Sequence, residues 1–156
     1  MKKISPVLFL SFALSLLFFT FTGRCYATLG GPPDSVQSDM KALSAARRGT
    51  INYDGYTIQE ITYSGATVRE YISSSDVVFA IAWNGQVHPD LKVLLGSYLD
   101  QYENALQETP RAFGRRYQKV TTDTIVVEKG GHMGSLWGRA YIPALMPPDV
   151  SVDMIE

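Results

Sequence analysis

Cysteine is nearly absent from this chain of 156 residues, and Cys25 is the only one. Histidine is also scarce, with only His88 and His132. A single cysteine excludes an intrachain disulfide, and it excludes a zinc site built from cysteine pairs. The fold must therefore be stabilised by a hydrophobic core, and the 46% of hydrophobic residues can supply one.

An excess of positive charge is lacking too. The chain has 14 basic and 15 acidic residues, which gives a net charge of −1. Domains that bind nucleic acid are usually strongly basic, so we expect no nucleic-acid partner. The G-x-S-x-G pattern of a serine hydrolase is also missing, and we assign no catalytic residue.

The one long apolar run lies close to the amino end. Lys2 and Lys3 precede an apolar run within residues 6–21, and the small residues of TGRCYA follow it up to Ala27. A charged start, an apolar run and small residues before a cut are typical of a secretory signal peptide. The run is shorter than the roughly 20 residues that span a membrane. We expect cleavage after Ala27 and a periplasmic or secreted protein that is not an integral membrane protein.

Two alternatives to a cleaved signal peptide bear on the same segment. The apolar run can instead be a retained anchor. A lipid on Cys25 is disfavoured, because Arg24 stands where lipoprotein signals carry a small residue. Cleavage after Ala27 removes three basic residues and leaves 129 residues with 11 basic and 15 acidic side chains, a net charge of −4. That length suits one domain over residues 28–156.

Hydrophobic periodicity predicts an α+β fold. The expected order is α-β-β-β-α-β-β: a mostly antiparallel sheet of about five strands, with one main helix packed on one face. The runner-up is a partly closed barrel around that helix. A short first helix should end at Gly49, and a turn should lie at residues 129–131. The expected strands cover 56–63, 66–73, 77–83, 121–128 and 133–142, the main helix covers 90–107, and an extended tail ends the chain.

Alternation of side chains predicts the two faces of the sheet. Residues 77–83 and 133–142 each carry small residues on one face and large ones on the other. We expect the main helix on the small-residue face. The other face would then form a partly exposed aromatic surface that binds an envelope protein, glycan or peptide; the alternative is burial within the chain. This surface would comprise Trp83, Trp137, Arg139 and Tyr141.

A basic segment with aromatic residues follows the main helix. It includes Arg111, Arg115, Arg116 and Lys119, interleaved with Phe113 and Tyr117. These side chains are a second candidate binding site, for an anion; the alternative is a solvated loop.

The two histidines offer the only candidates for polar chemistry. His132 with Asp90 or Asp123 would suit a small hydrolase. His88 and His132 with a carboxylate could bind a metal, but their spacing of 44 positions does not resemble a zinc motif. The simpler interpretations are a turn histidine and a helix cap. We therefore predict no metal site and no cofactor.

Two longer stretches resemble a known family. The first is SSSDVVFAIAWNGQVHPDLKVLLGSYLDQY, and the second is GGHMGSLWGRAYIPALMPPDV. They resemble an uncharacterised group of exported bacterial proteins, domain of unknown function 2844, from Thr28 to about Ile155. The resemblance implies a small exported protein and carries over no catalytic residue. The function expected from the sequence is that of a non-catalytic binding module of the cell envelope.

Overall fold

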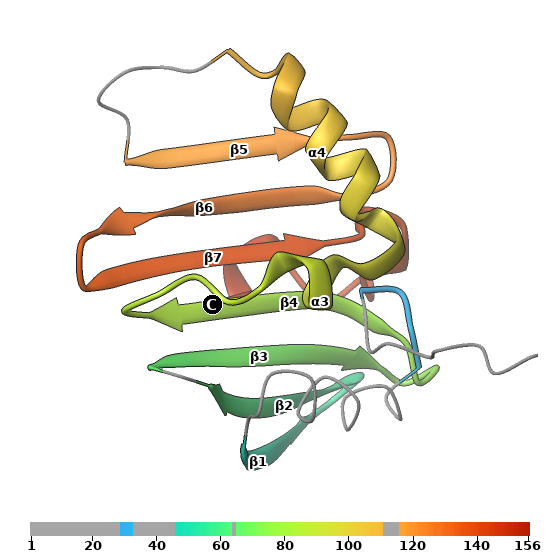
Figure 1. The fold of residues 1–156 in the computed structure, drawn as a ribbon. Coiled ribbons are helices and arrows are strands. Elements are labelled where there is room, and N and C mark those ends of the chain that lie inside the picture. The colour runs from blue at the N-terminus through green and yellow to red at the C-terminus, as the bar shows by residue number, and fades with distance from the viewer. Residues whose placement is uncertain (1–28, 33–45, 64, 111–115) are drawn as a thin grey trace, which may run out of the picture.

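One antiparallel sheet of seven strands forms the centre of the protein in the computed structural model (Figure 1), which describes residues 29–32, 46–63, 65–110 and 116–156. The strands follow the order β1-β2-β3-β4-β7-β6-β5. Their bounds are β1 Ala46–Tyr53, β2 Tyr56–Tyr63, β3 Ala66–Ser73, β4 Val78–Gly85, β5 Tyr117–Thr121, β6 Val126–His132 and β7 Ser135–Tyr141.

The prediction of a five-stranded α+β sheet is wrong, because the described chain is mainly a seven-stranded sheet with one helical segment. The first helix was expected to reach Gly49, but β1 already begins at Ala46; the rest of that helix lies outside the described residues. At residues 121–128 a single strand was expected. The structure has β5 and β6 there, joined by a polar turn in which the Thr122 hydroxyl accepts from Ile125 N at 3.0 Å.

The turn predicted at residues 129–131 is strand instead, and the chain turns at Met133 and Gly134. Glycines are common in turns, which explains the wrong prediction. Here Gly130 instead allows neighbouring groups to approach the strand closely. A Cβ on Gly130 would lie 2.8 Å from the carbonyl oxygen of Arg116 and 2.9 Å from the ring of Trp137.

A helical segment crosses one face of the sheet between β4 and β5 (Figure 1). It comprises α3 (Leu91–Leu95), a 3₁₀ turn (Gly96–Tyr98) and α4 (Leu99–Glu108). Asp90 caps α3, since its Oδ1 accepts a hydrogen bond from Lys92 N at 2.9 Å. The helix predicted over 90–107 is interrupted at Gly96, where a φ of 48° favours glycine.

Each face of the sheet carries its own core. On the side that we call the helix face, α3 and α4 contribute Leu94, Leu95 and Tyr102 to a cluster with Ile81 and Trp83. On the opposite side, the tail face, residues 143–156 cover the sheet, and Val150 and Ile155 pack with Tyr71, Phe79 and Tyr141. Figure 1 shows the helices and the C-terminal segment on opposite sides of the sheet. The tail, which was expected to be extended, contains two 3₁₀ turns, Pro143–Leu145 and Val152–Met154.

The expected packing of the helix on the small residues is right for β7 and wrong for β4. Trp83 stands opposite Gly138 in the register of β4 and β7, and Ile81 stands opposite Ala140. Opposed residues share a face, so the large residues of β4 lie beside the small residues of β7. The helix therefore covers Ile81 and Trp83.

Candidate functional site

Two exposed aromatic residues form a pair on the tail face near β5, the edge strand: Trp137 on β7 and Tyr117 on β5. The indole is 39% exposed and the phenol 46% exposed. Their ring centroids lie 5.9 Å apart, and the ring planes are inclined by 28°. Together the two rings form a platform of the size and geometry that stacks on another flat surface.

Gly130 on β6 makes this platform possible. In register, Gly130 stands between Tyr117 on one side and Trp137 on the other. Because Gly130 has no side chain, the indole can lie over the strand at a distance that a Cβ would occupy. The indole of Trp137 can take this position because Gly130 has no side chain.

A hollow adjoins Trp137 where the C-terminal segment ends. It has a volume of about 260 Å³. Its polar lining includes Asn84 and Arg139, and Ile155 and Glu156 form the wall on the side of the tail. Asn84 stands directly opposite Trp137 in the register, so the amide and the indole are neighbours on the same face.

Arg139 holds the tail against the sheet and is engaged on both sides. Its Nε donates to Glu128 Oε2 at 2.6 Å, and a second guanidinium nitrogen donates to the carbonyl oxygen of Val152 at 2.8 Å. Lys119 Nζ lies 2.9 Å from the other oxygen of Glu128. Burial alone would raise the pKa of Glu128, but the hydrogen bonds and charges of Lys119 and Arg139 outweigh it and hold the pKa below its usual value.

Tyr117 lies close to this ion-paired group. Burial and the nearby Glu128 carboxylate raise the pKa of its phenol. The hydroxyl is therefore a neutral hydrogen-bonding group at ordinary pH. The platform thus combines two rings with neutral polar groups.

Trp83 does not belong to the exposed surface that the sequence predicted. It is 2% exposed and lies on the helix face, opposite to Trp137. Its Nε1 donates to His88 Nδ1 at 3.0 Å. Burial first, and then the charge of Lys129, lower the pKa of His88, which favours the neutral form that accepts this hydrogen bond. Tyr141 shares the face of Trp137 but is buried among the residues that the tail covers.

The basic segment is only partly within the described residues. Arg111, Phe113 and Arg115 lie outside them. Arg116 is exposed, and its carbonyl oxygen accepts a hydrogen bond from Gly131 N at 3.0 Å. It immediately precedes Tyr117, so the two candidate binding sites of the sequence meet at this point.

The candidate hydrolase residues are separated in the structure. His132 is exposed at the end of β6, and its Nδ1 lies 3.2 Å from the carbonyl oxygen of Met133. Asp123 precedes the other end of β6, so the length of the strand, roughly 20 Å, separates the two. Asp90 caps α3. Among the described residues, no group of three histidine, cysteine or acidic side chains is placed to hold a metal ion.

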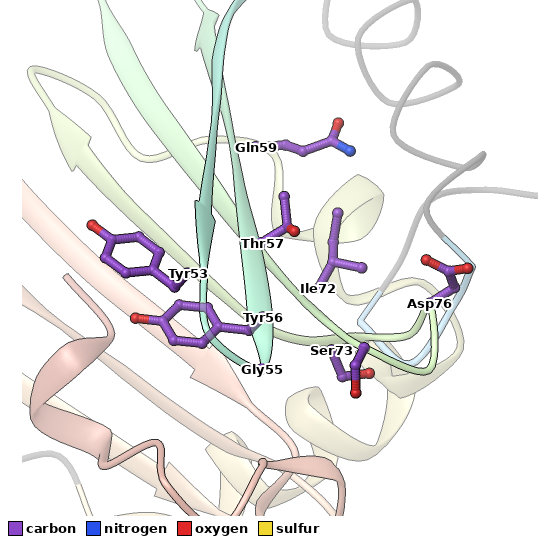
Figure 2. Close-up of a pocket in the computed structure, with 9 residues that line it drawn as sticks. Tyr53, Gly55, Tyr56, Thr57, Gln59, Ile72, Ser73 and Asp76 are labelled. Atoms are coloured by element: carbon purple, nitrogen blue, oxygen red, sulfur yellow. The ribbon is translucent and has the colours of Figure 1, made fainter.

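A second hollow lies at the end of the β1–β2 hairpin, with a volume of about 300 Å³. The rings of Tyr53 and Tyr56 stack 4.9 Å apart, inclined by 8°. Figure 2 shows these rings on one side of the strands, while Thr57, Gln59 and Ile72 point to the other. The tyrosines and the polar residues therefore do not converge on one ligand position.

The buried carboxyl group of Glu70 was not foreseen from the sequence. It is 1% exposed on the helix face, between Gln59 and Ile81 in the register. Neither oxygen has a hydrogen-bond partner among the described residues. Burial raises its pKa to about 7.

A comparison with known protein families finds a match over most of the chain. A family model described as a protein of unknown function (DUF2844) matches residues 25–155. The chain belongs to this family. The resemblance read from the sequence is thereby confirmed. Neither a curated protein nor a solved structure matches the chain. In the part of the chain that the structure describes, no helix is long and apolar enough to span a membrane.

The sequence identified Trp137 but missed Tyr117 as its partner. Tyr117 was assigned to a loop because β5 was not recognised. The signal was present, since TTDT is a polar turn that separates YQKV from IVVEK, and both flanking runs suit strands. Pairing these runs would have placed Tyr117 two strands away from Trp137.

Proposed function

We propose that the protein is a non-catalytic binding module of the cell envelope and that its ligand binds on the Trp137–Tyr117 platform. The observation that carries this proposal is the exposure of two near-parallel rings on a sheet face whose other aromatic residues are mostly covered by the tail. Exposed aromatic residues at the margin of a covered core are typical of binding surfaces.

Several contacts favour binding over catalysis. Glu128, the buried carboxylate nearest the platform, is ion-paired with two basic side chains. His88 accepts a hydrogen bond from Trp83, and His132 lies exposed at a hairpin end. A general base needs a free lone pair and an oriented partner, and neither histidine combines these features.

Indole resonances of the isotope-labelled protein provide the direct test, because the chain has two tryptophans and only Trp137 is exposed. The mature chain is titrated with envelope extract divided into a glycan pool and a peptide pool. We expect one pool to shift the Trp137 indole resonance and to leave that of buried Trp83 unchanged. If neither pool moves Trp137, the binding function is wrong.

The cellular location is part of the same proposal. The order of charged, apolar and small residues in residues 1–27 supports export and cleavage after Ala27. Mass spectrometry of the protein from the envelope fraction should then find Thr28 as the amino-terminal residue. An intact amino terminus would favour the retained anchor.

A further inference from the structure

The platform is the end of a row of side chains that runs across five strands. The register places Thr67 opposite Asn84, Asn84 opposite Trp137, Trp137 opposite Gly130, and Gly130 opposite Tyr117. Opposed residues share a face, so the row lies on the tail face from β3 to β5. With neighbouring strands about 4.8 Å apart, its length is about 19 Å.

The position of this row limits how a ligand can be held. β4, β7 and β6 each have a strand on both sides, so the sheet ladder uses their backbone hydrogen-bonding groups. A peptide that binds by strand addition requires an open strand edge, which these strands lack. β5, which carries Tyr117, is an edge strand, but a ligand that lies across the strands does not run parallel to that edge and cannot add to it as a strand. Contacts along the row therefore come from side chains: two rings for stacking, with an amide, an aliphatic hydroxyl and a phenol for hydrogen bonds.

Most of the charges beside the row are paired with one another, and the exposed Arg116 lies at its Tyr117 end. Arg69 Nε lies 3.1 Å from Glu60 Oε2, and Glu128 binds both Arg139 and Lys119. Groups that are already paired gain little from a charged ligand, which would have to compete with an existing partner. The row therefore favours a ligand without charge.

From these observations we infer that the platform binds a neutral polysaccharide chain, which lies across the strands along Thr67, Asn84, Trp137 and Tyr117. This inference rests on the proposed binding function and adds the class of ligand. The C–H groups on one face of a sugar ring pack against the flat, electron-rich faces of the indole and phenol. The sugar hydroxyls exchange hydrogen bonds with Asn84, Thr67 and the Tyr117 hydroxyl.

The same indole resonances test the class of ligand. The probes are the neutral and acidic fractions of the envelope glycan pool, the envelope peptide pool, and the neutral hexasaccharides of β-1,4-glucose, α-1,4-glucose and β-1,4-N-acetylglucosamine. We expect the neutral fraction and at least one hexasaccharide to shift the Trp137 resonance. The disaccharide with the same sugar and linkage as the hexasaccharide that binds should bind at least about tenfold more weakly than that hexasaccharide, because it contacts only part of the row.

Variants locate the site. Trp137→Ala and Tyr117→Ala should each weaken binding by about tenfold or more, measured calorimetrically. Tyr53→Ala is the matched control, because Tyr53 is also an exposed tyrosine in a stacked pair but lies on β1, outside the row. It should leave the affinity within about twofold of the unmodified protein, a change below roughly 0.5 kcal/mol.

Salt dependence separates a neutral ligand from an anionic one. Binding by stacking and neutral hydrogen bonds should change little between about 0.02 and 0.5 M salt, whereas binding to exposed Arg116 would weaken strongly. A response to the acidic fraction alone, with strong salt dependence, overturns the inference. A response to peptides alone overturns it as well but leaves the binding function standing. If no pool shifts Trp137, the binding function and this inference fail together.

Discussion

Each tryptophan of this protein lies against a glycine of the neighbouring strand. The indole of Trp83 lies on Gly138, and the indole of Trp137 lies on Gly130. The two pairs are on opposite faces, so one indole is buried under the helix and the other remains at the surface. The sequence predicted that the small residues of 133–142 lie under the main helix, but the group that packs on Gly138 is the indole of Trp83.

The pairing of Gly138 with Trp83 leads to a prediction about stability. A Cβ at position 138 would overlap the ring of Trp83 and come within 2.9 Å of the carbonyl oxygen of Glu128. We expect Gly138→Ala to lower the free energy of unfolding by about 3 kcal/mol, measured by urea denaturation. Gly49→Ala is the control, because a Cβ there meets no atom within 4 Å. Equal effects of the two substitutions would contradict the packing described here.

The buried Glu70 predicts a pH dependence. Its pKa is about 7 in the folded protein, against a usual value of 4.5. The neutral carboxyl group is tolerated in the core, so its contribution is fully present below about pH 4.5 and is lost as the pH rises through about 7. Relative to Glu70→Gln, the unmodified protein should lose roughly 3 kcal/mol of unfolding free energy across this range.

Urea denaturation at several pH values checks this prediction. The comparison with Glu70→Gln isolates one group from the other titrating residues, including Glu128, whose lowered pKa has the opposite sign of effect. Glu103→Gln, on the exposed surface of α4, is the matched control and should follow the unmodified protein. A constant difference between the Glu70→Gln and unmodified proteins at all pH values would be inconsistent with a raised pKa.

At the scale of elements, the sequence predicted strands best where alternation and turn residues agree. The strands predicted at 56–63 and 66–73 are confirmed as β2 and β3. The prediction failed where glycines suggest turns but serve close packing, as at Gly130. It also failed at residues 117–132, where the sequence predicted a single strand and the structure has two, β5 and β6. Local sequence patterns indicate the conformation of a residue itself. They carry little information about which side chain of a neighbouring strand packs against that residue.

The tail was expected to be an extended loop, and it is in fact the cover of one face of the sheet. Arg69 and Tyr71 both donate hydrogen bonds to the main-chain oxygen of Glu156, at 2.8 and 3.2 Å. The Tyr71 hydroxyl also accepts one from Glu156 N at 3.0 Å. Nothing in the spacing of the tail residues pointed to these contacts, because they join positions more than 80 residues apart.

The covering role of the tail predicts a contrast between two adjacent residues. Ile155 is buried among the residues of the tail face, whereas the neighbouring Met154 is largely exposed. We expect Ile155→Ala to cost about 3 kcal/mol of unfolding free energy through the cavity it leaves, and Met154→Ala to cost less than about 0.5 kcal/mol. Thermal and urea denaturation of both variants measures the difference. A small effect of Ile155→Ala would mean that the tail adds little to the core.

At the scale of the whole molecule, the sheet is covered by different means on its two sides. Helices cover the helix face, and the tail covers part of the tail face. The platform lies where the tail ends, beside the hollow that Asn84 and Arg139 line. The proposed binding site was therefore only half predictable. Trp137 stood out as an aromatic residue on an alternating strand, but its exposure depends on how far the tail extends across the sheet.

The central claim is that Trp137 is open to solvent while Trp83 is enclosed. Acrylamide quenching of the unmodified protein and of Trp137→Phe tests it most directly. The unmodified protein should show a red-shifted, readily quenched component together with a blue-shifted, protected one. Trp137→Phe should lose the quenched component and keep the protected emission of Trp83. If the emission that remains in Trp137→Phe is readily quenched, or if the unmodified protein shows protected emission alone, the platform described here does not exist.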